Sequence, residues 1–331
     1  MTYNFDPVPP GYVSRIDAGG FEDLALALFH YQYNHNEVYR AYVRAIGRKA
    51  GDVTRLEDIP FLPVSFFKTH RVVTGNWQQP ALLFESSGTT GEIPARHEVR
   101  DAEVYRQSLI RGFRKFYGDP SDYVILALLP SYLERSNASL VHMAGVLMEQ
   151  GRHTDSGFYL DEWERLAKIL QRLEQAGRKT LLLGVTFALL DFAAAYSMKL
   201  RHTIVMETGG MKGRRAEWTR GQVHGMLKDQ WSCERIHSEY GMTELLSQAY
   251  AREDGRFYCS DTMKVLLRDM QDPLDVLASG TGCINVIDLA NVHSCAFIAT
   301  DDIGRLAPGG GFEVLGRMDH SALRGCSLMA V

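Results

Sequence analysis

Between residues 101 and 240 the chain alternates short apolar runs with longer amphipathic segments. The pattern predicts strands at residues 123–129, 180–183, 203–207 and 235–238. It predicts helices at residues 101–117, 139–149, 161–176, 186–198 and 214–228, with N-terminal caps at Asp101, Asp161 and Thr186. Strands that alternate with helices are typical of a largely parallel sheet flanked by helices on both faces. We therefore expect an α/β fold.

Three polar segments directly follow predicted strands, at residues 85–94, 207–210 and 239–244. The first follows a short apolar run at residues 81–84, and the other two follow strands of the predicted sheet. Ligands of parallel sheets bind beyond the carboxyl ends of the strands. We therefore expect the three segments to lie on one rim of the sheet.

The two ends of the chain differ from this middle part. Residues 21–47 have helical spacing, and residues 59–68 form an apolar, proline-containing segment that we expect to cover the core in an extended form. From about residue 255 short apolar runs alternate with turns rich in Gly and Asp, which predicts a smaller β-rich subdomain. We divide the chain into an α/β core at 1–254, the β-rich subdomain at 255–316, and a tail at 317–331.

Composition excludes several classes of protein. The net charge is −4 and no basic stripe is present, so nucleic acid is not an expected partner. No apolar run reaches the roughly 18 residues of a membrane span, and the first residues do not resemble a signal peptide. The five cysteines have neither disulfide-framework nor zinc-site spacing, which favours the reducing cytoplasm.

The segment after residue 84 has the composition of a phosphate-binding loop. It contains four hydroxyl side chains and two glycines, namely Ser86, Ser87, Gly88, Thr89, Thr90 and Gly91. Glycines let the backbone approach a ligand closely, and successive N–H groups can form an anion-binding nest. The spacing of a P-loop is missing. For this loop alone, an ordinary turn of the same composition is the alternative interpretation.

A second group of residues could hold the rest of a nucleotide. Tyr240 offers an aromatic face for a base, and Thr243 and Glu244 offer oxygen atoms for a phosphate or Mg²⁺. The segment at 300–305 contains Asp301 and Asp302, whose carboxylates suit ribose hydroxyls. Taken singly, these segments could equally be a packed strand end and an acidic turn.

In their order along the chain, the segments at 86–94, 240–244, 301–305 and 316–319 resemble the core motifs of the adenylate-forming enzymes. These enzymes include acyl-CoA synthetases and firefly-type luciferases. A closer likeness is to a shorter branch, the acyl-protein synthetase component of the fatty-acid reductase in bacterial bioluminescence. The segments at 59–70 and 324–328 are similar to characteristic segments of that family.

The resemblance implies a role for each motif residue. Ser86, Ser87, Gly88, Thr89 and Thr90 would close over the β- and γ-phosphates of ATP. Tyr240, with Gly241 beside it, would lie against adenine, and Thr243 would contact the α-phosphate. Glu244 would hold Mg²⁺. The remaining nucleotide contacts would come from residues lining the base and the ribose, namely Gly209, Gly210, Met211, Asp302 and Arg317.

The sequence departs from the larger adenylate-forming enzymes in three places. Ile93 precedes Pro94, Arg96 stands where many relatives carry Lys, and the hinge segment at 316–325 is one residue shorter. The chain also ends soon after this segment, so we expect the large N-terminal domain of these enzymes without their C-terminal lid. In the acyl-protein synthetases a cysteine near the C-terminus accepts the acyl group, and Cys326 matches that position.

The expected function is ATP-dependent activation of a fatty or other carboxylic acid to an acyl-adenylate, followed by transfer to the Cys326 thiol. The resemblance implies ATP and Mg²⁺ as cofactors, and a reductase or acyltransferase protein as partner. Two alternatives stay open at this point. The chain could be an acyl- or aryl-CoA ligase of the phenylacetate type, or a nucleotide-binding subunit without catalytic activity.

Overall fold

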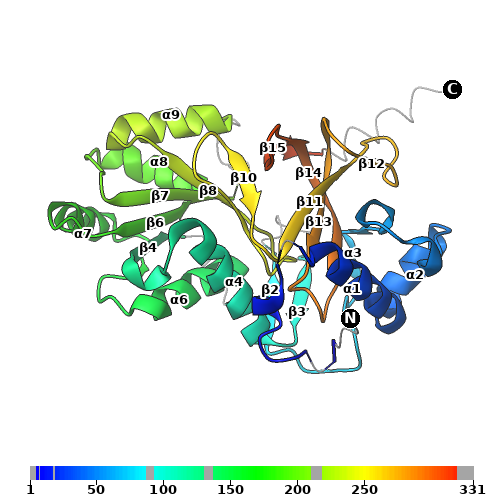
Figure 1. Ribbon diagram of the computed structural model, residues 1–331. Helices are drawn as coiled ribbons and strands as arrows, with labels where there is room; N and C mark the ends of the chain where they lie inside the picture. The colour runs from blue at the N-terminus through cyan, green and yellow to red at the C-terminus, as the bar shows by residue number, and fades with distance from the viewer. Residues whose placement is uncertain are drawn as a thin grey trace.

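The computed structural model describes residues 5–6, 8–17, 19–86, 93–129, 137–209 and 218–318 (Figure 1). Its central element is a parallel sheet built from five strands: β4 (Val124–Leu128), β5 (Gly157–Phe158), β6 (Thr180–Val185), β7 (Thr203–Thr208) and β8 (Ile236–Tyr240). They lie in the order β5-β4-β6-β7-β8, and each neighbouring pair is parallel. The predicted parallel sheet is confirmed.

Within the described ranges, five helices flank this sheet: α4 (Ala102–Tyr117), α6 (Ser139–Gly151), α7 (Trp163–Gln175), α8 (Thr186–Ala195) and α9 (Arg220–Trp231). In Figure 1, α8 and α9 lie above the strands and α4 and α6 below them. Strands β4 and β6 are buried along their whole length, which explains why they consist of continuous apolar runs. The α/β class predicted from the alternation is therefore confirmed.

The sheet continues without a break into an antiparallel part. Its strands are β9 (Ala249–Ala251), β10 (Arg256–Cys259), β11 (Met263–Arg268), β12 (Val276–Leu277), β13 (Thr281–Asp288), β14 (Phe297–Leu306) and β15 (Phe312–Arg317). From β8 the order is β9-β10-β15-β14-β13-β11-β12, and β1 (Leu62–Pro63) pairs with β14. The strands predicted beyond residue 255 are present, while the domain boundaries remain a prediction.

The remaining elements are short or lie near the N-terminus. A separate hairpin joins β2 (Leu82–Glu85) to β3 (Arg96–Val99). The helices are α1 (Phe21–His35), α2 (Glu37–Ala45) and α3 (Phe66–Thr69), and the 3-10 turns are Val13–Arg15, Ala50–Asp52, Leu56–Asp58 and Pro120–Asp122. None of the helices in the described ranges combines the length and the apolar character that a membrane crossing requires.

Residues 21–47 are mostly helical, as predicted, but they form two helices, α1 and α2, because the chain breaks at Asn36. This residue is extended, with φ −118° and ψ 108°, and its side chain accepts a hydrogen bond from the Tyr39 N–H. The amide group also donates to Thr74 Oγ1 and to the carbonyl oxygen of Ser294. Asn36 thus ends α1 and caps α2, as Asn side chains commonly do.

Of the three predicted caps, one is confirmed. The Asp101 side chain accepts the Glu103 N–H at 2.9 Å and caps α4. The predicted cap at Asp161 is wrong, because α7 begins after Glu162 and has no side-chain cap. Thr186 is also wrong as a cap: it is the first residue of α8, and its hydroxyl lies 2.7 Å from the Gly209 carbonyl oxygen and 3.0 Å from Glu207 Oε2.

A buried carboxylate, Asp288 at the end of β13, fixes the segment that follows β8. It accepts hydrogen bonds from the backbone N–H groups of Leu246, Ser247 and Ala290, and from the Ser247 hydroxyl. Asp288 has no exposed surface. Because one side chain joins residues 246–247 to β13, the loop after β8 is held against the antiparallel part of the sheet.

Candidate active site

A cleft of about 1910 Å³ opens at the carboxyl ends of β7 and β8, where they face β14 and β15. Its lining contains every residue predicted for the site that lies in the described ranges, namely Ser86, Gly209, Tyr240, Gly241, Thr243, Glu244, Asp302 and Arg317. The expectation that these segments share one rim of the sheet is met for these residues. Ser87, Gly88, Thr89, Thr90, Gly91, Gly210, Met211 and Cys326 lie outside the described residues.

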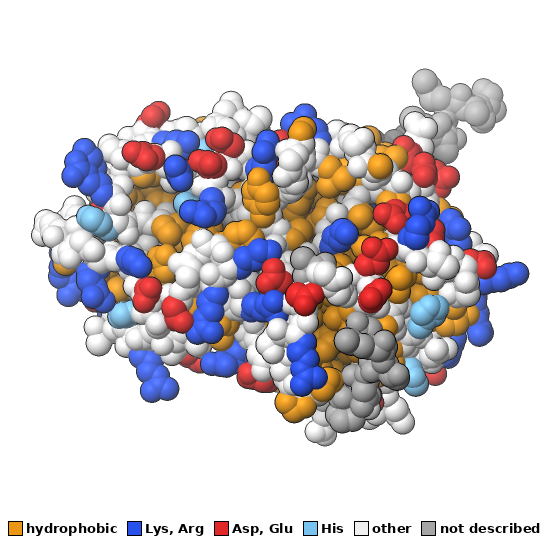
Figure 2. Space-filling view, in the orientation of Figure 1, with side chains coloured by type: hydrophobic (Ala, Val, Ile, Leu, Met, Phe, Trp, Pro, Cys, Tyr) orange, Lys and Arg blue, Asp and Glu red, His pale blue; other side chains and the backbone are white. Residues whose placement is uncertain are grey.

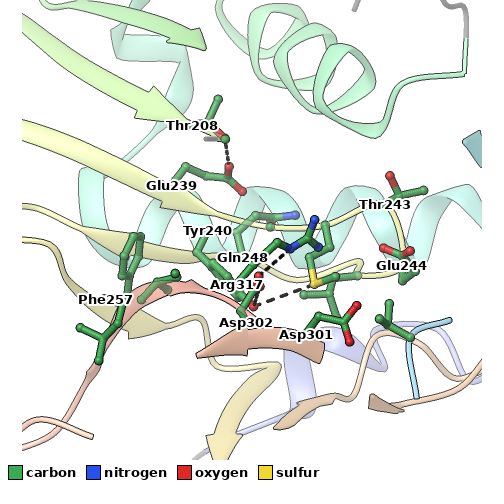
Figure 3. Close-up of a pocket in the computed structure, with 18 of the residues that line it drawn as sticks. Thr208, Glu239, Tyr240, Thr243, Glu244, Gln248, Phe257, Asp301, Asp302 and Arg317 are labelled. Carbon is green, nitrogen blue, oxygen red and sulfur yellow. Dashed lines mark hydrogen bonds and ion pairs between the residues drawn. The ribbon is translucent and has the colours of Figure 1, made fainter. Parts of the chain in front are cut away.

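Tyr240, Asp302 and Arg317 form one connected group in the cleft (Figure 3). The Tyr240 hydroxyl donates to Asp302 Oδ2 at 2.8 Å, and Arg317 Nε donates to Asp302 Oδ1 at 3.0 Å. The Tyr240 ring packs edge-on against Phe312 and Phe257, with centroid distances of 5.5 and 5.9 Å. Burial and the neighbouring Asp302 raise the pKa of Tyr240 well above its usual value, so the phenol keeps its proton.

Two side chains from other parts of the chain hold Thr243 and Glu244 in place. His97 Nδ1 lies 2.9 Å from the Thr243 carbonyl oxygen, and Asn291 Nδ2 donates to the Glu244 carbonyl oxygen at 2.8 Å. Because a carbonyl only accepts, His97 carries its proton on Nδ1. Burial lowers the pKa of His97 to about 4, so the ring stays neutral. Sequence reasoning missed both residues, since neither is near Thr243 in the chain.

Glu244 is an acidic residue in the lining of the cleft. Its side chain is buried, and burial raises its pKa to about 7, although the nearby charges of Arg317 and Lys68 lower it. The described residues contain no group of three or more His, Cys, Asp or Glu side chains that could hold a metal ion. Mg²⁺ is usually bound through one or two carboxylates together with substrate phosphates and waters, so the Glu244 carboxylate is a ligand of the type that such a site uses.

The end of β7 is held by a charged residue that sequence reasoning also missed. Arg220 Nε lies 3.3 Å from Glu207 Oε1, and the Ser238 hydroxyl donates to the same oxygen at 2.6 Å. Burial opposes ionisation of Glu207, yet a hydrogen bond from His224 and the charge of Arg220 lower its pKa below the usual value. Gly209 follows with φ +71°, a conformation that favours glycine.

Ser86 lies at the base of the β2–β3 hairpin rather than at its tip. The Ala95 N–H donates to Ser86 Oγ at 2.8 Å, and the Ser86 N–H donates to the Ala95 carbonyl oxygen at 3.0 Å. Next to it, Arg96 forms an ion pair of 3.2 Å with Glu85. The two hydrogen bonds between Ser86 and Ala95 thus join the end of β2 to the start of β3, where the predicted phosphate loop begins and ends.

On the face shown in Figure 2, basic and acidic side chains are intermixed over both parts of the sheet. This face has no basic stripe of the kind that follows a nucleic acid backbone. The four cysteines in the described residues carry free thiols, and Cys283 and Cys295 are buried. Cys233 and Cys259 are half-buried.

The fold is that of the adenylate-forming enzymes. The solved structure of ATP-bound MatB from Rhodopseudomonas palustris matches 74% of this chain with a TM-score of 0.54 and 17% sequence identity. The match covers 50% of the MatB chain, so this protein spans about half the length of that structure. The fold class predicted from the sequence is confirmed.

Within that class, the sequence profile of the family described as "Acyl-protein synthetase, LuxE" matches residues 18–330. The chain belongs to this family, and the predicted enzyme class, a ligase, is confirmed. Two similar proteins are named long-chain-fatty-acid–luciferin-component ligase. The one from Aliivibrio fischeri is 23% identical over 93% of this chain and 86% of its own length; the one from Vibrio harveyi is 25% identical over 92% and 85%.

Proposed function

We propose that this protein uses ATP to convert a carboxylic acid to an acyl-adenylate and then transfers the acyl group to a cysteine thiol. The observation that carries the proposal is the group formed by Tyr240, Asp302 and Arg317, with Thr243 and Glu244 in the same cleft. A base can stack on an aromatic ring, and ribose hydroxyls can bond to a carboxylate. A hydroxyl can donate to an α-phosphate, and an acidic side chain can hold a metal ion.

In the first half-reaction, a carboxylate oxygen attacks the α-phosphorus of ATP and the bond to pyrophosphate breaks. Thr243 would donate to the α-phosphate, and Arg317 adds positive charge near the ribose. Charge on the phosphates must be balanced where it develops, and the reacting atoms must be in line. Glu244 would hold Mg²⁺, which supplies further positive charge when bound.

In the second half-reaction, the Cys326 thiolate would attack the acyl carbon, and AMP would leave with the electrons of the mixed-anhydride bond. This step rests on the family resemblance of the C-terminal segment. A reducing cytoplasm would keep that thiol free. The acyl group would then pass to a partner protein, a reductase or an acyltransferase. The names of the relatives suggest a long-chain fatty acid as the substrate.

Pyrophosphate release over a panel of carboxylic acids, with and without CoA, tests this proposal. We expect release that depends on ATP and acid and needs no CoA, together with acyl label on the protein. Release that depends on CoA would instead indicate a CoA ligase. Absence of release with every acid, in a protein that still binds ATP, would indicate a nucleotide-binding subunit.

A further inference from the structure

The cleft has a second polar group, which the nucleotide-binding residues do not use. Successive side chains of a strand point to opposite faces, so Glu239 points away from the side on which Tyr240 reaches Asp302. In the sheet register Glu239 lies between Thr208 on β7 and Tyr250 on β9. Thr208 Oγ1 donates to Glu239 Oε2 at 2.5 Å. Figure 3 shows this pair apart from the Tyr240–Asp302–Arg317 group.

Two buried atoms of this second group lack hydrogen-bond partners within the described part of the chain. Gln248 is 3% exposed, and its Oε1 atom is buried without a partner. The Tyr250 hydroxyl is buried without a partner as well. Glu239 is 7% exposed, and Thr208 donates to its Oε2 atom. Buried polar atoms normally have partners, so Gln248 Oε1, in the lining of the cleft, is suited to accept a hydrogen bond from a ligand.

Glu239 and Gln248 flank the same glycine. A Cβ atom placed on Gly241 would lie 2.5 Å from Glu239 Oε1 and 3.7 Å from Gln248 Cγ. Both side chains also line the cleft. The glycine therefore leaves the space into which the Glu239 carboxyl group turns, and the two polar side chains lie close enough to contact one ligand group.

Part of the cleft lining is apolar. The same cleft is lined by Tyr105 from α4 and by Ala138, Leu140 and Met143 in and before α6. If ATP occupies the Tyr240 side, the remaining ligand is the acid, whose carboxylate must reach the nucleotide. The tail of the acid would then lie against these apolar side chains and reach the polar atoms of Glu239 and Gln248.

We propose that Glu239 and Gln248 form a hydrogen-bonding floor of the acyl pocket, and that the substrate is a carboxylic acid carrying a hydroxyl group on its acyl part. This inference rests on the proposed function. A hydroxyl donates to Gln248 Oε1 or Glu239 Oε1, whereas an unsubstituted alkyl tail leaves Gln248 Oε1 unpaired. Sites built to bond a substrate hydroxyl discriminate strongly against the analogue that lacks it.

The protonation of Glu239 favours a hydroxyl over an ammonium group. Burial raises the pKa of Glu239 to about 7, although the hydrogen bond from Thr208 lowers it. Below that pH the carboxyl group is mainly neutral. A neutral carboxyl both donates to and accepts from a hydroxyl, but it gives an ammonium ion no opposite charge.

The test uses pairs of acids that differ only in one hydroxyl: straight-chain fatty acids with the hydroxyl at successive positions, and phenyl-substituted acids with and without a ring hydroxyl. Amino-substituted counterparts form a third arm. Binding of each acid is measured by calorimetry, and kcat/KM is measured for pyrophosphate release. We expect at least one hydroxylated acid to exceed its unsubstituted partner by about tenfold or more in both measurements.

Variants test whether Glu239 and Gln248 cause the preference for the hydroxylated acid. Glu239→Leu and Gln248→Leu should each reduce the preference for the hydroxylated acid, and Glu239→Gln, which keeps a polar group, should retain part of it. The control is Glu253→Gln, which alters a surface ion pair with Arg235 and should leave the preference unchanged. The melting temperature of each variant shows whether it is folded.

Different experimental results would overturn the proposed hydroxyl-binding floor and the proposed function. Equal binding of both members of every pair, or a preference that persists in folded Glu239→Leu, would overturn the hydroxyl-binding floor. Tighter binding of the amino-substituted acids would overturn the choice of a hydroxyl. Lack of pyrophosphate release, with hydroxyl-dependent binding intact, would count against the proposed function and leave the floor standing.

Discussion

The phenol of Tyr240 donates a 2.8 Å hydrogen bond to Asp302, a residue 62 positions further along the chain. Arg317 donates to the other oxygen of the same carboxylate. The residues expected to contact the base and the ribose are therefore connected to each other. A change at Tyr240 should act on the ribose position as well as on the base position.

Replacing Tyr240 separates these two contributions. Tyr240→Ala removes both the ring and the hydrogen bond, and loss of a base–aromatic stack should weaken ATP binding by about 1–3 kcal/mol. Tyr240→Phe keeps the ring and removes only the hydroxyl, so its ATP affinity should lie between those of Tyr240→Ala and the wild type. Calorimetry checks the order. Unchanged affinity in Tyr240→Ala would remove this residue from the nucleotide site.

Glu244→Gln should fold normally and make little acyl-adenylate. The variant keeps the size of the side chain but cannot supply a carboxylate to Mg²⁺, and the Asn291 bond is to the backbone and stays available. Pyrophosphate release is the measurement, and Glu253→Gln is the matched control because it is a surface glutamate. Wild-type release by Glu244→Gln would refute the metal-binding role.

Glu239 should give the protein a defined pH dependence of stability. Burial raises its pKa from 4.5 to about 7, so between these pH values the folded chain binds more protons at Glu239 than the unfolded chain. Its contribution to the free energy of unfolding therefore falls as the pH rises through this window. Glu239→Gln lacks the effect. Urea unfolding should show that the wild type loses stability relative to the variant as the pH rises through this window. A difference in unfolding free energy that does not change with pH would contradict the raised pKa.

Asp288→Ala should destabilise the protein by at least about 3 kcal/mol. The truncation leaves buried N–H groups of Leu246, Ser247 and Ala290 without an acceptor, and each unpaired group costs about 1–3 kcal/mol. Denaturant unfolding measures the change. Asp229→Ala, at an exposed position of α9, is the control and should stay within about 0.5 kcal/mol of the wild type. A similarly small effect at Asp288 would show that the loop is held by other contacts.

The fold was predictable where local pattern and burial agree. Continuous apolar runs such as β4 and β6 are buried on both faces, and Asp101 caps its helix through a bond to a residue two positions away. The break at Asn36 was missed and Thr186 was misjudged as a cap, because contacts with residues distant in sequence help to fix both. Asn36 bonds to Ser294, and Thr186 bonds to the end of β7, contacts that no local spacing reveals.

The candidate site was predictable only in part. Tyr240, Glu244 and Asp302 belong to motifs that a sequence displays, and they line one cleft. His97 was missed because it holds Thr243 through a backbone carbonyl 146 positions away. Glu239 directly precedes Tyr240, and the alternation of side chains along a strand was the signal that could have placed it on the other face.

Transfer of labelled acid to the protein tests the central claim most directly. Wild type, Cys326→Ser and Glu244→Gln are each incubated with ATP and labelled fatty or hydroxylated fatty acid, then separated on a denaturing gel and mapped by peptide. The account predicts hydroxylamine-sensitive label on Cys326 in the wild type, pyrophosphate release without stable label in Cys326→Ser, and neither in Glu244→Gln. Wild-type label that maps away from Cys326, or label that persists in Cys326→Ser, would contradict it.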